Sequence, residues 1–170
     1  MSDLIVFNKP YGVICQFSPH EKHRSLKEFI GLPDVYPAGR LDTDSEGLLL
    51  LTANGRLQAK IADPRYKTVK TYWAQLEGSP DEAKLNVLRH GVDLGDFVTR
   101  PAQIRLPEKS ETDRLWPRVP PIRVRKSVPD FWLEIRISEG KNRQVRRMTA
   151  KAGYPCLRLV RVGIGRLDLW

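Results

Sequence analysis

Residues 39–55 have the sequence GRLDTDSEGLLLLTANG, in which a polar segment leads directly into four consecutive leucines. The leucines and Thr52 form a short apolar run bounded by Gly47 and by Asn54-Gly55, and this pattern predicts a strand buried on both faces. The polar side chains within residues 40–46 therefore lie in a loop that leads directly into a core strand. Loops held in this way often contain functional side chains. From spacing alone, solvated surface carboxylates would explain the segment equally well.

Periodicity elsewhere predicts further strands at residues 4–7, 67–78, 102–106 and 131–137, with two more runs within 156–169. Helices are predicted at 56–62, 79–91 and 142–153, with one helical turn starting from a capping box at 25–28. Connections of hairpin length and this many strands favour an α+β fold, with a mixed, largely antiparallel central sheet and flanking helices.

Three segments give more detailed expectations. The helix after Ser79 has a capping serine followed by Pro80, and its inward residues are predicted to be Ala83, Val87 and Leu88. Residues 131–137 alternate strictly, which predicts a half-buried strand with one polar face. Residues 108–121 contain many charges and prolines, and they predict a surface loop.

The helix at 142–153 has Val145, Met148 and Ala152 on its inward face. At 100° per residue, Arg143 points away from the core and Arg146 lies on the flank.

Composition narrows the class of protein. The 170 residues include 29 Lys and Arg against 20 Asp and Glu, giving a net charge of +9, which favours a polyanionic partner such as nucleic acid. An enzyme and a structural RNA-binding protein fit this charge equally well. His20 and His23 have no further ligand at metal spacing, so no metal site is expected.

Cys15 and Cys156 lie far apart in the sequence, without CxxC spacing, and are expected to be buried, inert thiols in a reducing compartment. No secretory leader and no apolar run of about 20 residues is present, so a soluble, cytoplasmic protein with no membrane partner is expected.

Four sequence blocks occur in an order that resembles the RNA pseudouridine synthases that modify small- and large-subunit ribosomal RNA. They are NKPYG at 8–12, GRLDTDSEGLLLLT at 39–52, KTY at 70–72 and EGKNRQVRRM at 139–148. The resemblance implies the pseudouridine synthase fold with a basic active-site cleft. It also implies that residues 1–170 form one catalytic domain of two halves, without the S4 RNA-binding domain that often precedes it.

The resemblance assigns the site residues as well. Asp42 matches the nucleophile, Tyr72 the tyrosine that stacks on the target base, and Arg146 the basic residue that faces the nucleophile, keeps it ionised and orients its oxygens. Arg40 and Lys141 are further candidates for positioning phosphate. Lys9 is expected to have a structural role in a corner beside the Asp42 loop.

The implied reaction breaks the ribose C1′–N1 bond of uridine, turns the uracil and rejoins it through C5. Atoms are conserved, so no cofactor is expected, and Asp42 could act at C6 of the base or at C1′ of the ribose. The expected partner is large-subunit (23S) ribosomal RNA, and the protein is expected to be monomeric.

Two other functions remain open. An inactive ribosomal RNA-binding or assembly factor would explain the charge, and a glycosidase could use paired carboxylates such as Asp44 and Glu46. We interpret Asp44 and Ser45 as hydrogen-bonding loop residues and Glu46 as the partner of a nearby cation.

Overall fold

The computed structural model describes residues 4–123 and 125–170. Residues 1–3, in which no leader pattern was found, and residue 124, in the basic segment, lie outside the described residues. The elements are β1 (Ile5–Lys9), β2 (Val13–Ile14), β3 (Arg24–Ser25), η1 (Leu26–Glu28), β4 (Tyr36–Pro37), β5 (Glu46–Thr52), α1 (Gly55–Ala62), η2 (Pro64–Tyr66), β6 (Lys70–Glu77), α2 (Glu82–His90), β7 (Gln103–Arg105), α3 (Lys109–Thr112), β8 (Asp130–Ile137), α4 (Gln144–Lys151), β9 (Cys156–Ile164) and β10 (Leu167–Asp168).

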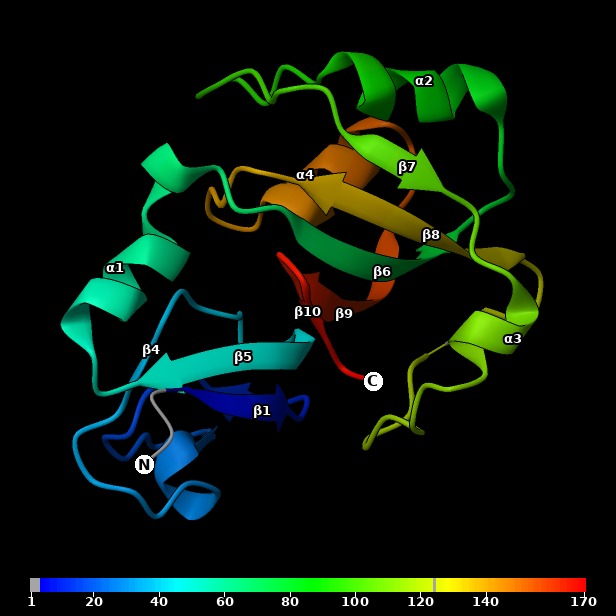
Figure 1. Cartoon of the computed structure of the whole chain (residues 1–170). Helices are drawn as coiled ribbons and strands as arrows, with labels where there is room; N and C mark the ends of the chain where they lie inside the picture. The colour runs from blue at the N-terminus through cyan, green and yellow to red at the C-terminus, as the bar shows by residue number, and fades with distance from the viewer. Residues whose placement is uncertain (1–3, 124) are drawn as a thin grey trace.

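An eight-stranded sheet runs through the molecule in the order β1-β5-β9-β6-β8-β7, with β4 added beside β5 and β10 beside β9 (Figure 1). Within this sheet only β5 and β9 pair in parallel, through Glu46 with Val160 and Gly47 with Arg161, and the other pairings are antiparallel. The predicted α+β fold with a mixed, largely antiparallel sheet is confirmed. The parallel pair joins the N-terminal strands to the C-terminal ones.

Strand β5 is the predicted central element, and every one of its residues is buried. Its leucines alternate between two apolar clusters. Leu49 and Leu51 pack with Val13 and Leu26 on one face, whereas Leu48 and Leu50 pack with other residues on the opposite face. Burial on both faces explains why this strand has an unbroken apolar run.

Helices α2 and α4 lie together against one face of β6, β8 and β9 (Figure 1). The alternation of Tyr72, Ala74 and Leu76 directs these side chains toward that face, as predicted. Helix α4 contributes Val145 and Met148, again as the periodicity indicated.

The start of α2 differs from the prediction. Its N-cap is Asp81, whose carboxylate accepts from the backbone N–H groups of Ala83 and Lys84 at 2.9 and 3.2 Å, and Ser79 lies before the helix. The two possible capping residues lie two positions apart, and the later one caps the helix. Leu88 is buried as predicted, together with Leu85, whereas Ala83 and Val87, also predicted to face inward, are exposed.

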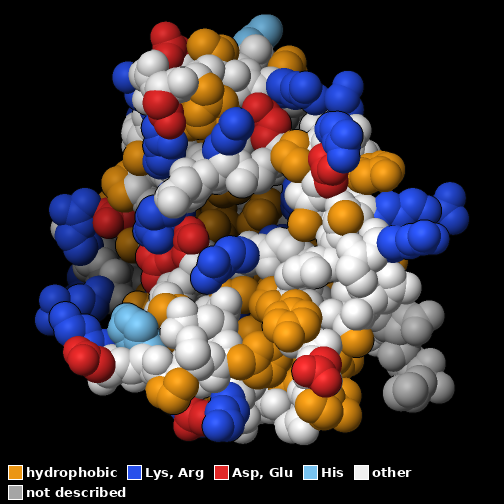
Figure 2. Space-filling view, turned by 90° about the vertical axis from the view of Figure 1, so that its left-hand side faces the viewer, with side chains coloured by type: hydrophobic (Ala, Val, Ile, Leu, Met, Phe, Trp, Pro, Cys, Tyr) orange, Lys and Arg blue, Asp and Glu red, His pale blue; other side chains and the backbone are white. Residues whose placement is uncertain are grey.

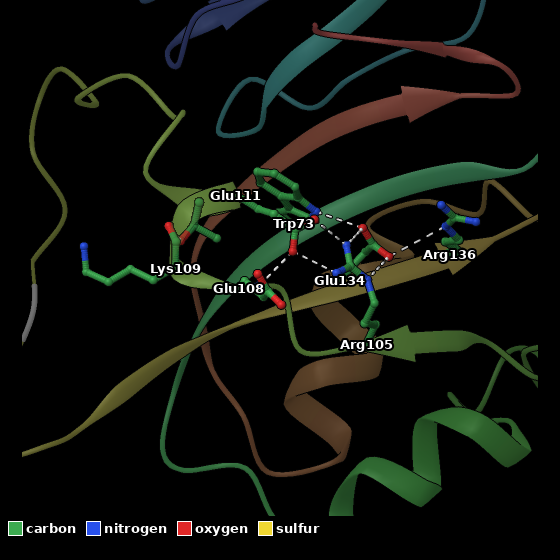
Figure 3. A network of polar contacts seen from close by, with 8 residues as sticks. Trp73, Arg105, Glu108, Lys109, Glu111, Glu134 and Arg136 are labelled. Atoms are coloured by element: carbon green, nitrogen blue, oxygen red, sulfur yellow. Dashed lines mark hydrogen bonds and ion pairs between the residues drawn. The ribbon is translucent and has the colours of Figure 1, made fainter.

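The face of β8 that bears Glu134 and Arg136 is only partly open to solvent, because Arg136 is exposed whereas Glu134 is buried. Figure 3 shows Glu134 among Trp73, Arg105 and Arg136, and only 7% of Glu134 is exposed. Arg105 donates to both Glu134 carboxylate oxygens, at 2.9 and 3.1 Å, and Trp73 Nε1 donates at 3.1 Å. Arg105 also pairs with Glu111 of α3, so part of the predicted surface loop is a short helix that covers this face.

Candidate active site

A cavity of about 1000 Å³ opens beside the junction of β5 and β9. Figure 2 shows a hollow with hydrophobic side chains in its depth and both acidic and basic side chains at its edge. Four of the five residues predicted from the sequence to form the site line the cavity: Arg40, Asp42, Tyr72 and Lys141. The segments that supply them are separated by up to about a hundred residues, so the sheet order brings them together.

Backbone contacts fix the loop that holds Asp42. The Gly12 N–H donates to Thr43 O at 2.8 Å, and the Ser45 N–H donates back to Asp42 O at 3.0 Å. Lys9 Nζ donates to Pro10 O and Val13 O, both at 2.8 Å, and to Thr43 O at 3.4 Å. The corner at residues 8–12 therefore supports the loop, as predicted for Lys9.

Lys9 is completely buried, although it bears no direct ion pair among the described residues. Burial lowers the pKa of its ammonium from 10.5 to about 8, and the nearby carboxylates of Glu46, Asp44 and Asp42 oppose that shift only in part. The ammonium acts as a three-way donor to carbonyl groups and does not face the cavity as a free cation.

Asp42 contacts a different arginine from the one expected. Its Oδ2 lies 3.4 Å from Arg143 Nη1, and its side chain is 39% exposed. Arg143 also forms a two-pronged ion pair with Asp44, at 3.0 and 2.9 Å, and these hydrogen bonds hold the pKa of the Asp44 carboxyl below its ordinary value. Asp44 therefore forms the closer pair with Arg143, and Asp42 is left with one long contact.

Arg143 was predicted to lie on a helix and to point away from the core; its side chain is 44% exposed, but the residue lies before the helix. Helix α4 begins at Gln144, and Arg143 is its N-cap residue in a left-handed conformation with φ of 50°. That conformation turns the side chain out of the helical progression and toward the Asp42 loop. Helical periodicity contains no signal for such a position, so spacing could not have found this residue.

Arg146 does not contact Asp42 directly among the described residues. Its Nη2 donates to the backbone oxygen of Asp44 at 2.7 Å, and its Nε lies 3.7 Å from Asp44 Oδ2. The side chain is 15% exposed, which agrees with its predicted place on the flank of the helix. Arg146 thus faces the loop that bears the Asp42 carboxylate. The expected direct pair with Asp42 is not formed, and Arg146 contacts Asp44 in its place.

The three remaining candidates also line the cavity. Tyr72 lies on β6 and pairs across the sheet with Ile135 and Arg161. Lys141 Nζ lies 5.6 Å from the centre of the Phe97 ring, and Arg40 makes only a long hydrogen bond of 3.4 Å to Cys15 O. Neither cation is neutralised by a carboxylate among the described residues, so both are available to an anionic ligand.

Glu46 does not line the cavity, and its carboxylate is bound by other side chains. Its carboxylate is buried and accepts from Arg158 Nε and Nη2 at 2.9 and 3.0 Å and from Trp116 Nε1 at 2.8 Å. The prediction that Glu46 partners a cation is confirmed. With Glu46 and Asp44 both engaged, the arrangement offers one available carboxylate, Asp42, and does not favour a two-carboxylate hydrolase.

The remaining reactive groups in the described part of the chain form no second centre. No group of three or more His, Cys, Asp or Glu is placed to hold a metal ion among residues 4–123 and 125–170. Both cysteines are free; Cys15 is buried as predicted, whereas Cys156 is only partly buried. The buried surroundings of the Cys156 sulfur still raise the pKa of its thiol to about 11, which disfavours the reactive thiolate. No helix of the described chain is long and apolar enough to cross a membrane.

Comparison with known proteins identifies the family of this chain. A family model described as RNA pseudouridylate synthase matches residues 3–151. A relative from Xanthomonas axonopodis pv. citri, named ribosomal large subunit pseudouridine synthase E, is 59% identical over 169 residues, covering 97% of this chain and 88% of the relative. A protein of the same name from Vibrio vulnificus is 52% identical over 166 residues, covering 98% and 70% of the two chains.

Solved structures agree on the fold. A crystal structure of a pseudouridylate synthase superposes with a TM-score of 0.79 at 27% identity, and the match covers 98% of this chain and 64% of that one. An archaeal Nop10-Cbf5 complex superposes with a TM-score of 0.60 at 16% identity, covering 98% of this chain and 49% of that one, a likeness of fold alone. On the family match and the identity to its relatives, this chain belongs to the RNA pseudouridine synthase family.

Proposed function

We propose that this protein isomerises a specific uridine to pseudouridine in large-subunit ribosomal RNA, with Asp42 as the nucleophile. The single observation that supports the role of Asp42 most directly is its position. It is the one carboxylate of the loop that lines the cavity without a close two-pronged ion pair, because Arg143 is committed to Asp44 and Arg158 to Glu46.

The geometry supports a division of roles around the cavity. A uridine must leave its stack to reach the carboxylate, and the unpaired base would enter the cavity beside Tyr72, whose ring can cover its face. Asp42 then attacks either C6 of the base or C1′ of the ribose, and the C1′–N1 bond breaks. The base turns and rejoins through C5, and the bond to Asp42 breaks so that the carboxylate is restored. The proton released from C5 balances the one taken up at N1, so the product is an isomer of the substrate.

Arg146 and Arg143 would serve this reaction by fixing the Asp42 loop. Their four nitrogen contacts to Asp44 hold the loop to the start of α4. Preorganised groups of this kind lower the barrier because no loop rearrangement is needed when the reaction begins. Arg40 and Lys141 would contact the phosphates that flank the extruded nucleotide.

We further propose that the protein acts on RNA as a monomer in the cytoplasm, where ribosomal RNA is found in bacteria. Its net charge of +9 supports an electrostatic component of RNA binding that weakens with salt. The names of the relatives support the large ribosomal subunit as the source of the RNA.

The test compares wild type with Asp42→Asn on unmodified large-subunit RNA, both free and in ribosomal particles. New pseudouridine is detected as a carbodiimide adduct that stops reverse transcriptase. We expect pseudouridine with wild type, none with Asp42→Asn, and unchanged RNA affinity, because the nucleophile adds little to ground-state binding. Asp113→Asn, in the exposed pair with Lys109, is the matched control and should retain activity.

Each alternative function gives a different result. A binding or assembly factor would form no pseudouridine on either substrate, and a glycosidase would release free uracil and leave an abasic ribose. Full activity of Asp42→Asn would refute the assignment of the nucleophile while leaving the reaction itself in place.

A further inference from the structure

Two cations on the sheet side of the cavity have no role in the mechanism described so far. Lys70 is the first residue of β6, and Arg161 lies on β9 directly across from Tyr72. Lys70 and Tyr72 are two residues apart on one strand, so their side chains share a face. Both cations line the same cavity as Asp42.

Arg161 is a buried cation without a carboxylate partner among the described residues. Only 4% of the residue is exposed. Its Nε donates to Leu48 O at 2.9 Å and its Nη1 to Arg40 O at 3.3 Å, but its buried Nη2 has no hydrogen-bond partner. A buried charged donor without a partner is costly, so a ligand that accepts from it would gain an unusually strong hydrogen bond.

Lys70 adds a second cation beside it. Its amine makes no hydrogen bond or ion pair within the described chain. It lies next to Gly140, which also lines the cavity, and a Cβ added there would be 3.6 Å from Nζ. Burial and the neighbouring Arg161 charge both lower the pKa of Lys70. Two like charges held together at a cavity wall, with no acid between them, form a site for negative charge in a ligand.

We propose that Lys70 and Arg161 bind the uracil carbonyl oxygen that becomes negatively charged during isomerisation. The inference rests on the proposed function and deepens it, because it adds a catalytic role for two residues that the motifs do not assign.

The chemistry requires such a site on either route of attack. If Asp42 bonds to C1′, the electron pair of the C1′–N1 bond leaves with the base, and its charge is shared between N1 and the two carbonyl oxygens. If Asp42 adds to C6, the charge appears on O4 as an enolate. In both cases the negative charge leaves the base when C5 has bonded to C1′ and the bond to Asp42 breaks, which restores the carboxylate. C5 then loses its proton and N1 gains one. Fixed cations that line a cavity stabilise such transient charge more than water does, because they need no reorganisation when the charge develops.

A phosphate is the competing ligand for the same pair of cations. It would be bound equally in the ground state and in the transition state, so losing a cation would weaken RNA binding. Losing a contact to the developing carbonyl charge would instead slow the reaction of bound RNA. The two ligands are therefore distinguished by whether affinity or rate changes.

The experiment measures RNA affinity and the single-turnover rate for Lys70→Met, with wild type as the reference. In the rate measurement each protein is present at a concentration that saturates the RNA. Methionine keeps the unbranched stem and removes the charge. We expect a rate about 10²-fold lower, the usual effect of removing one such donor, with affinity changed less than about twofold. Lys70→Arg should recover part of the rate. Lys151→Met, at the exposed end of α4, is the matched charge control and should keep the wild-type rate.

A second readout separates chemistry from structure. In RNA whose target is 5-fluorouridine, the fluorine withdraws electrons and stabilises the anionic base by itself. The rate of consumption of that nucleoside should therefore fall less on Lys70→Met than the rate for uridine does. Arg161→Lys keeps a positive charge on the side chain. Its rate should likewise fall less with the fluorinated target than with uridine.

Three outcomes would overturn the inference. These are an unchanged rate in Lys70→Met, a loss confined to affinity, which would indicate phosphate, or equal losses with uridine and 5-fluorouridine, which would indicate a structural role. Failure of the proposed function is distinct, because wild type itself would then form no pseudouridine. An active wild type with an inactive Asp42→Asn and an active Lys70→Met would refute this inference alone.

Discussion

Replacement of Glu46 by glutamine should destabilise the protein strongly, although the substitution changes hardly any volume. The Glu46 side chain is 1% exposed and that of Arg158 is 9% exposed, and the two form a two-pronged pair. Trp116 completes the cluster, since its Nε1 donates to Glu46 and its backbone oxygen accepts from Arg158 Nη2 at 2.9 Å. A glutamine would keep one acceptor but would place an N–H₂ donor against the guanidinium.

The magnitude follows from burial. Removing one partner of a buried pair leaves an uncompensated charge and typically costs about 3 to 5 kcal/mol. For a chain of this size, about 2 to 4 °C of melting temperature corresponds to each kcal/mol, so the expected shift is about 6 to 20 °C. The exposed pair of Arg24 and Glu28, with side chains 63% and 48% exposed, contributes about 0.3 to 0.5 kcal/mol and supplies the matched control, Glu28→Gln.

Urea denaturation of wild type, Glu46→Gln, Glu28→Gln and the double variant Glu46→Gln/Arg158→Met measures these differences. The double variant should be more stable than Glu46→Gln alone, because it removes the unpaired charge together with its partner. A loss below about 1 kcal/mol in Glu46→Gln, or a double variant less stable than the single one, would refute the reasoning that the buried charge dominates.

Three further substitutions test the supports of the Asp42 loop. Arg146→Met should abolish pseudouridine formation and lower unfolding free energy by about 1.5 to 3 kcal/mol, because it removes the charged donor to Asp44 O; wild-type stability in urea would contradict the second part. The pKa of Lys9 falls from 10.5 in the unfolded chain to about 8 in the folded protein, so the native state binds fewer protons than the unfolded state between these pH values. The free energy of unfolding should therefore rise by up to about 3 kcal/mol from pH 8 to 10.5. Chemical denaturation of Lys9→Met should not show that rise. Gly47→Ala should yield little folded protein by circular dichroism, because Gly47 has φ of +110° and a Cβ would lie 2.2 Å from a backbone oxygen of β9, whereas Gly55→Ala, with nothing within 4 Å, should fold normally.

The sequence alone determined the elements whose patterns report local burial. The leucine run predicts β5 because a strand buried on both faces needs apolar side chains at every position, and the alternation around Tyr72 predicts the face that meets α4. The ordered motifs also placed Asp42, Tyr72, Arg40 and Lys141, and all four line one cavity.

Only the tertiary structure decided which charged groups meet. Arg143 reaches Asp42 and Asp44 because one left-handed residue precedes α4, and Arg158 reaches Glu46 because β9 lies parallel to β5. Periodicity describes which face of an element is buried, but it contains no information on which distant element covers that face. An ion pair between residues more than a hundred positions apart depends on the order of the strands, and that order is fixed only when the whole sheet assembles.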